Sequence, residues 1–147
     1  MGGLHGKIVI LSVENEDDIY NVILKAIRNY KNLDICNYFQ DKEMIQAGAL
    51  KMDVAQRTTL INDIEIRLSN IEFEILYLLA SNPGRVFSKE QIYDIVWQEP
   101  YSGDYNIVMS HIHHIREKIE DNPGKPLYIQ TVWGIGYRFN KNLSSGL

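Results

Sequence analysis

The stretch that decides the fold is Leu127-Tyr-Ile-Gln-Thr-Val-Trp-Gly-Ile-Gly-Tyr-Arg-Phe139, which lies close to the end of this 147-residue sequence. Residues 127–132 and 136–139 are rich in β-branched and aromatic side chains, and this composition predicts two short strands. The residues between them, 133–135, include a glycine that permits a tight turn. The stretch is therefore expected to form a β-hairpin.

Three helices are expected upstream of this hairpin. Ser69 with Glu72, and Ser88 with Gln91, form capping boxes that begin the first and second helices. The second helix is expected to bury Ile92, Ile95, Val96 and Trp97. The third helix is expected over residues 104–121, where one apolar stripe recurs at helical spacing. The stripe consists of Val108, Ile112, Ile115 and Ile119.

A segment in which apolar and polar residues alternate, 49–67, precedes the helices and predicts three short antiparallel strands. Asn62-Asp63 occupies a hairpin-turn position within this segment. We place the main domain boundary near Gly48, after a short polar stretch. The fold expected for residues 48–141 is therefore α+β, with an N-terminal antiparallel sheet, three helices and a C-terminal hairpin.

The composition is that of a folded, soluble protein, because 45% of the residues are hydrophobic and 23% are charged. No apolar run approaches the roughly 20 residues needed to cross a bilayer, and the start lacks a signal peptide, so a cytoplasmic protein is expected. Fifteen basic and nineteen acidic side chains give a net charge of −4, which predicts modest non-specific attraction to nucleic acid. Cys36 is the only cysteine, which excludes an internal disulfide.

Three helices followed by a hairpin make a winged helix-turn-helix, and the stretch from Leu68 to Arg138 resembles the OmpR/PhoB-type effector domain of bacterial response regulators. The resemblance is carried by Leu68-Ser-Asn-Ile-Glu-Phe73, Gly84-Arg-Val-Phe-Ser88, Val96-Trp97, Val108 with His111 and Ile112, Ile115-Arg-Glu-Lys118 and Ile129-Gln-Thr-Val-Trp-Gly-Ile-Gly-Tyr-Arg138. It implies a DNA-binding domain that regulates transcription.

The third helix of such a domain would enter the major groove of DNA. With the apolar stripe against the core, the residues that point outward are Asn106, Ser110, His113, His114 and Glu117. The first four carry short hydrogen-bonding groups that suit base edges or phosphates, although a merely solvated helix face is the alternative. Arg116 and Lys118 flank the face and are expected to contact phosphates. The resemblance implies a DNA backbone contact for His111 as well.

The histidines also raise the question of a metal site, because His111 and His114 lie one helical turn apart. The sequence places no carboxylate or cysteine beside them to complete a ligand set. We therefore expect neither a bound metal nor a cofactor.

In the hairpin, Tyr137 and Arg138 match positions of the family's wing, and Thr131 is placed to reach a phosphate with its hydroxyl. Trp133 departs from the family, which usually carries an arginine here that extends into the minor groove. Because an indole supplies no cation, Trp133 is expected to stack on sugar or to contact a neighbouring protein. Trp97 fits a family position whose ring N–H contacts the phosphate backbone, with plain core packing as the alternative.

Residues 1–47 follow a strand, helix, strand pattern and resemble the first part of a receiver domain. A receiver that accepts phosphate needs an acidic pair after its first strand, but Ser12 and Val13 stand there, so we expect no phosphorylation site. The apolar run 8–11 needs more cover than this segment supplies, which predicts dimerisation through it; folding back on the winged helix is the alternative. Residues 142–147 are expected to form a flexible tail.

The expected function is sequence-specific regulation of transcription, with double-stranded DNA, a second copy of the chain and RNA polymerase as partners. The alternative is a protein-interaction module that no longer binds DNA, which the net charge of −4 and Trp133 favour. An enzyme is not expected, because the sequence has no glycine-rich phosphate loop and no Ser/His/Asp set that can be placed in one pocket.

Overall fold

The computed structural model describes residues 43–98 and 104–143, together with the single residue Ile23. The two longer ranges belong to one compact unit that begins at Tyr38. Apart from Ile23, the strand, helix and strand expected before residue 40 lie outside the described residues, as do residues 144–147 of the expected tail.

A four-stranded antiparallel sheet opens the described part of the chain. Its strands, which pair in chain order, are β1 (Met44–Ala47), β2 (Leu50–Asp53), β3 (Thr58–Ile61) and β4 (Ile64–Ile66). The sequence predicted the last three and missed β1, which pairs with β2 across a turn at Gly48. The sheet therefore begins before the expected boundary near Gly48. Asn62 and Asp63 both have positive φ, as the expected tight hairpin turn requires.

The first two long helices, α2 (Asn70–Ser81) and α3 (Lys89–Trp97), begin at the predicted caps. The hydroxyl of Ser69 accepts a hydrogen bond from the backbone N–H of Glu72, and the Glu72 carboxylate accepts one from the backbone N–H of Ser69. Ser88 and Gln91 form the same reciprocal pair at the start of α3. These bonds satisfy N–H groups that have no partner inside the helix.

The buried side of α3 differs in part from the prediction. Ile92 and Ile95 are buried as expected, but Val96 and Trp97 are only half-buried, and Tyr93 is buried in their place. The Tyr93 ring stacks on the Trp97 indole, with their centroids 4.9 Å apart. Tyrosine carries a polar hydroxyl on a large apolar ring. The sequence-based prediction left Tyr93 out of the buried side because of the hydroxyl, but the ring is apolar enough to be buried.

The third long helix, α4 (Asn106–Ile119), confirms the predicted apolar stripe. Its buried residues are Val108, Ile112, Ile115 and Ile119. The predicted hairpin is also confirmed, as β5 (Ile129–Val132) and β6 (Gly136–Phe139). β5 starts two residues later than expected, because the backbone N–H groups of Leu127 and Tyr128 donate to the carboxylate of Glu120 instead of to a strand.

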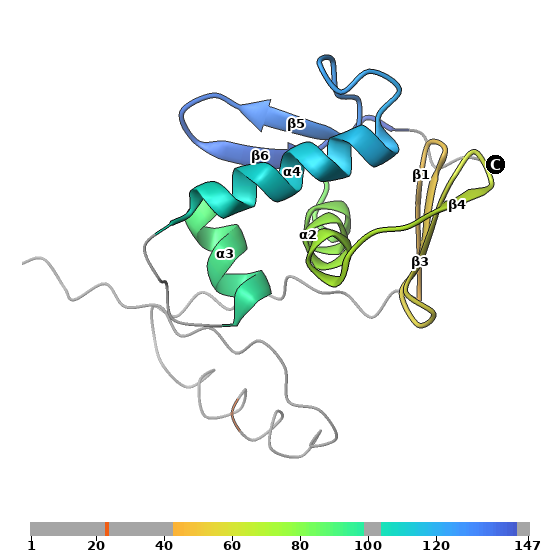
Figure 1. Cartoon of the computed structure of the whole chain (residues 1–147), viewed down its shortest axis with the longest axis horizontal. Helices are drawn as coiled ribbons and strands as arrows, with labels where there is room; N and C mark the ends of the chain where they lie inside the picture. The colour runs from red at the N-terminus through yellow and green to blue at the C-terminus, as the bar shows by residue number, and fades with distance from the viewer. Residues whose placement is uncertain (1–22, 24–42, 99–103, 144–147) are drawn as a thin grey trace, which may run out of the picture. The chain divides into compact units, whose positions relative to one another are not determined.

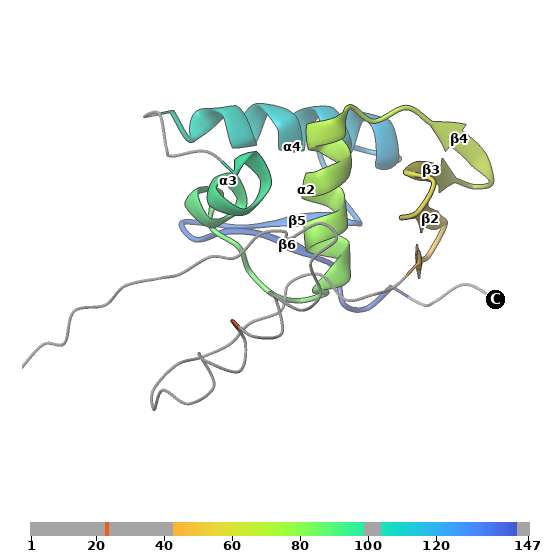
Figure 2. The ribbon, with the colours of Figure 1, turned by 90° about the horizontal axis from the view of Figure 1, so that it is seen from below.

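The elements form one core around α2. Figure 1 shows the four-stranded sheet on one side of α2 and α3 on the other, while α4 passes across both helices. Figure 2, turned by 90°, shows the β5–β6 hairpin running in the same direction as α4. The largest fully buried side chains are Phe87, Phe139, Leu50, Met52, Ile75, Leu76, Leu78, Leu79, Ile92, Ile112, Ile115 and Ile129. This arrangement is the α+β winged helix-turn-helix expected from the sequence.

Candidate nucleic-acid interface

The exposed face of α4 carries the residues that were expected to point outward. All five are exposed: Asn106, Ser110, His113, His114 and Glu117. Nε2 of His113 lies 3.0 Å from Oε1 of Glu117, one helical turn further along. The carboxylate of Asp104 accepts a hydrogen bond from the backbone N–H of Asn106 at 2.9 Å, which helps to begin the helix. These five residues thus offer amide, hydroxyl, imidazole and carboxylate groups rather than ammonium or guanidinium groups.

Arg116 connects α4 to the hairpin. Its Nε and Nη2 donate to the carbonyl oxygen of Ile129 at 3.1 and 2.8 Å, and Nη2 also donates to Oγ1 of Thr131 at 2.8 Å. Its guanidinium carbon lies 5.6 Å from the centroid of the Tyr137 ring. Burial lowers the pKa of Arg116, against the opposite effects of Tyr137 and Glu120. The sequence analysis expected a phosphate contact here, whereas these donors are engaged with β5.

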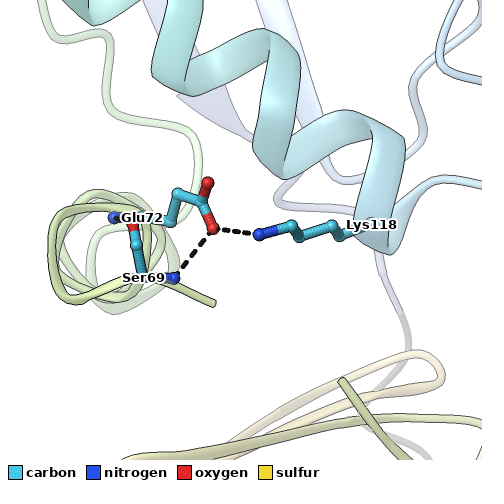
Figure 3. Close-up of polar contacts among 3 residues, drawn as sticks. All are labelled: Ser69, Glu72 and Lys118. Atoms are coloured by element: carbon cyan, nitrogen blue, oxygen red, sulfur yellow. Dashed lines mark hydrogen bonds and ion pairs between the residues drawn. The ribbon is translucent and has the colours of Figure 1, made fainter. Parts of the chain in front are cut away.

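Lys118 connects α4 to α2. Its ammonium nitrogen lies 2.6 Å from Oε2 of Glu72, and the carboxylate side chain is only 7% exposed. Figure 3 shows Glu72 reaching from the first turn of α2 and accepting contacts from both Ser69 and Lys118. Burial on its own would raise the pKa of Glu72, but the hydrogen bonds from Lys118 and Ser69 outweigh this, so its pKa is lowered. Lys118, also expected at a phosphate, therefore neutralises a buried carboxylate.

Glu120 fixes the end of α4 to the start of the hairpin, and the sequence analysis missed it. Its buried carboxylate accepts backbone hydrogen bonds from Leu127, Tyr128 and Ile129 at 2.8 to 3.2 Å. Charged acceptors make stronger hydrogen bonds than neutral ones. Because no local sequence signal marks a carboxylate that binds backbone seven to nine residues later, the structure was needed to find this contact. Arg116 and Glu120 together set the position of the hairpin against α4.

The tip of the hairpin is strongly exposed. Trp133 is 90% exposed and Ile135 is 63% exposed, on either side of Gly134, whose φ of 76° favours glycine. Gly136, by contrast, is tightly packed. A Cβ at this position would lie 2.0 Å from the carbonyl oxygen of Phe87, so no larger residue fits without a shift of the backbone. Phe87 pairs with β6 through two backbone hydrogen bonds to Tyr137. The hairpin is thus anchored at its base and projects an indole into solvent.

The remaining wing residues have distinct surroundings. Arg138 is exposed, and its Nε donates to Oε1 of Gln130 at 3.0 Å across the hairpin. Tyr137 and Thr131 are half-buried beside Arg116. The exposed cation of this hairpin is therefore at Arg138, whereas the tip, where the resemblance implied an arginine, carries Trp133.

Trp97 and His111 lie together at the contact between α3 and α4. Their ring centroids are 5.4 Å apart, and both residues are half-buried. Nδ1 of His111 is buried and has no hydrogen-bond partner among the described residues. Burial lowers the pKa of His111, and His114 adds to this effect while Glu72 opposes it. His111 therefore faces the interior of the domain more than the sequence suggested.

The structure thus divides the predicted site residues into two groups. Asn106, Ser110, His113 and His114 share the exposed face of α4, and Trp133 and Arg138 project from the hairpin beside it. The other predicted site residues make contacts within the domain. They are Trp97, His111, Arg116, Lys118, Thr131 and Tyr137. Among the described residues, no helix has both the length and the apolar character needed to cross a membrane.

The four-stranded sheet, the three helices and the hairpin together define the class of protein. It is a winged helix-turn-helix domain of the type used by transcription regulators. Residues 63–139 match the family described as transcriptional regulatory protein, C terminal, and the chain belongs to that family. It is the OmpR/PhoB type that the sequence analysis expected, and it is a family of regulators rather than a class of enzymes.

Similar proteins are regulators that are longer than this chain. The chain is 44% identical over 99 residues to the uncharacterized transcriptional regulatory protein YcbL of Bacillus subtilis, covering 67% of this chain and 44% of YcbL. It is 41% identical over 121 residues to the response regulator SaeR of Staphylococcus epidermidis, covering 82% of this chain and 53% of SaeR. The chain therefore spans about half the length of the curated relatives it matches.

Two solved structures show the same fold. The response regulator DrrB of Thermotoga maritima, an OmpR/PhoB homolog, superposes with a TM-score of 0.63 and 38% identity, over 67% of this chain and 45% of DrrB. The RstA DNA-binding domain of Klebsiella pneumoniae, solved in complex with the RstA box, gives a TM-score of 0.62 and 27% identity. That match covers 67% of this chain and 98% of the RstA chain.

Proposed function

We propose that this chain binds double-stranded DNA sequence-specifically, with the exposed face of α4 in the major groove, and thereby regulates transcription. The observation that carries the proposal is that α4 buries one apolar stripe and exposes the short polar side chains of Asn106, Ser110, His113 and His114. Such a helix, joined to the hairpin by Arg116 and Glu120, has the shape and hydrogen-bonding groups to read base edges. The similarity to a domain solved with its DNA box supports the same use.

The test is a gel shift of the 147-residue chain against genomic fragments, repeated at increasing salt. A DNA-binding protein should select a subset of fragments, and its affinity should fall steeply with salt because phosphate contacts release counterions. The net charge of −4 predicts weak binding to the fragments that are not selected. Equal and salt-insensitive retention of all fragments would argue against the proposal.

His113 and His114 are the residues to change on the α4 face, because both are exposed and outside the core. His113→Ala and His114→Ala should each weaken specific binding by about 1 to 3 kcal/mol if the residue contacts a base. Gln56→Ala, at an exposed position in the turn between β2 and β3, is the matched control and should leave affinity unchanged. If both histidine variants bind the selected fragment as tightly as the parent, α4 does not read DNA through this face.

The second candidate function is a protein-interaction module, and the exposed hairpin tip favours it. Trp133 and Ile135 place two large apolar side chains in solvent on a domain of net negative charge. Exposed apolar groups of this kind are typical of protein contact sites. Failure to select any DNA fragment, combined with self-association that Trp133→Gln abolishes, would favour this function over DNA binding.

We further propose that regulation does not depend on phosphorylation and that residues 1–47 mediate dimerisation. The support comes from the sequence, which has Ser12 and Val13 at the place of the acidic pair and an unusually apolar run at 8–11. Light scattering on the 147-residue chain should give a dimer, and a fragment of residues 38–147 should be monomeric. Acetyl phosphate should leave DNA affinity unchanged. A monomeric 147-residue chain would contradict dimerisation through residues 1–47. A DNA affinity that changes with acetyl phosphate would contradict regulation without phosphorylation.

A further inference from the structure

His111, His114 and Glu72 form a cluster that reaches from the exposed face of α4 to the buried first turn of α2. One ring nitrogen of each histidine and one carboxylate oxygen all lie within 4.8 Å of one another. The sequence analysis expected no metal because the histidine pair on α4 lacked a third ligand. The fold supplies that ligand from the first turn of α2, which packs against α4. The reason for excluding a metal site therefore no longer holds.

His111 is suited to bind a cation. Its buried Nδ1 has no hydrogen-bond partner among the described residues, although buried polar atoms nearly always have one. Imidazole nitrogens are the commonest metal ligands in proteins. A bound ion is one partner that the unpaired imidazole can accept without a change of fold.

Glu72 is suited to serve as the third ligand. Both of its contacts, from Ser69 and Lys118, use Oε2, so Oε1 accepts no hydrogen bond from the described residues. Figure 3 shows the second oxygen of the carboxylate outside the two dashed contacts. Hydrogen bonds to the non-coordinating oxygen are the usual way in which proteins orient a carboxylate ligand.

We propose that Glu72, His111 and His114 bind one Zn²⁺ ion, with a water molecule in the fourth position. Two imidazoles and a carboxylate favour Zn²⁺ over Mg²⁺ or Ca²⁺, which prefer oxygen ligands alone. Tetrahedral zinc ligands lie about 3.3 Å apart, so the ligand atoms must move closer than they are here. His114 is exposed, and rotation of its side chain allows this movement. The ion would cross-link the start of α2 to α4.

The test is a calorimetric titration of Zn²⁺ into the EDTA-treated 147-residue chain without an affinity tag. The parent should bind one equivalent of Zn²⁺, and Mg²⁺ should give no saturable heat. His114→Gln should weaken Zn²⁺ binding about tenfold or more. His113→Gln is the matched control, because it removes the neighbouring exposed imidazole from the same helix and should leave Zn²⁺ affinity within about twofold of the parent.

A second measurement places the ion at all three ligands. Zn²⁺ should raise the midpoint of thermal unfolding of the parent and of His113→Gln, since it binds only the folded cluster, and should not raise that of His111→Gln, His114→Gln or Glu72→Gln. Circular dichroism confirms that each variant is folded. The proposal is overturned if Zn²⁺ gives no saturable binding, if His113→Gln and His114→Gln weaken it equally, or if Glu72→Gln still binds with the parent's affinity.

Discussion

Nη2 of Arg116 donates a hydrogen bond to the carbonyl oxygen of Ile129 at 2.8 Å, which joins α4 to the first strand of the hairpin. Nε of the same side chain donates to the same oxygen at 3.1 Å. Through this pair of hydrogen bonds, the orientation of the hairpin depends on the Arg116 side chain. The sequence alone had predicted a phosphate contact for that side chain. Its role is therefore open to a direct test.

Arg116→Ala is expected to lower the free energy of unfolding by about 1 to 3 kcal/mol, because the carbonyl of the buried Ile129 loses its charged donor. The slope of log affinity for DNA against log salt should not change, since no phosphate contact is lost. Arg138→Ala is the matched control, because Arg138 is exposed. It should preserve stability and reduce the slope by about one. Denaturant unfolding measures the stability, and gel shifts at increasing salt measure the slope. A reduced slope in Arg116→Ala would show that Arg116 contacts a DNA phosphate after all.

Lys118→Ala is expected to destabilise the domain by about 1 to 3 kcal/mol, because it leaves the buried Glu72 carboxylate with one hydrogen bond fewer. The comparison is Lys51→Ala, which breaks an ion pair of similar length to the 80% exposed Asp63. That surface pair should contribute less than about 1 kcal/mol. Urea unfolding of both variants gives the difference, and equal effects would show that burial of Glu72 does not strengthen its ion pair.

Glu120→Gln is expected to lower the free energy of unfolding by about 1.5 to 3 kcal/mol, because one acceptor oxygen is replaced by an amide donor facing backbone N–H groups. Glu117→Gln, on the exposed face of the same helix, should change it by less than about 0.5 kcal/mol. Hydrogen exchange locates the effect, since the amides of Tyr128 and Ile129 should exchange faster in Glu120→Gln alone. Unchanged exchange at these amides would contradict the conclusion that the Glu120 carboxylate fixes the start of the hairpin to α4.

Tyr137 should make stability depend on alkaline pH. Burial raises the pKa of its phenol above the usual value, and Arg116 only partly opposes this. The unfolded chain then loses the proton first, so the free energy of unfolding should fall as the pH rises above about 10. Tyr137→Phe cannot ionise and should lack this part of the decline. Urea unfolding between about pH 9 and pH 11 measures it, and identical pH profiles in parent and variant would refute the assignment.

Trp133→Arg should increase affinity for the selected DNA and steepen its salt dependence by about one phosphate contact, if the hairpin approaches the minor groove. Trp133→Gln separates the gain of a cation from the loss of the indole, because it removes the ring without adding charge. The side chain is 90% exposed, so neither change should affect folding. Equal affinities of the two variants would mean that the hairpin tip does not contact DNA.

The sequence predicted those parts of the fold that depend on neighbouring residues. The Ser69 and Ser88 caps, the stripe on α4 and the turn at Asn62-Asp63 each follow from residues within a few positions of one another. β1 was missed because Met44–Ala47 is only four residues long and follows the charged residues 41–43, and its pairing with β2 makes it a strand. A pattern of four residues does not show whether they will pair with a neighbouring strand.

The same limit explains the differences at the candidate site. Helical periodicity correctly placed His113 and His114 on the exposed face, since that depends on α4 alone. It did not show that Lys118 meets Glu72 or that Arg116 meets Ile129, because those partners come from other elements. A long basic side chain beside an exposed face can equally reach back to the protein, and tertiary packing decides between the two.

The positions of the two tryptophans give the chain two separate fluorescent reporters. Trp97 is half-buried, stacked on Tyr93 and 5.4 Å from the His111 ring, whereas Trp133 is in solvent at the hairpin tip. The sequence contains no other tryptophan. In Trp133→Gln, all indole emission therefore comes from Trp97 and reports on the His111 cluster, and in Trp97→Phe it comes from the hairpin. Binding at the two ends of this domain can thus be followed independently, without an attached dye.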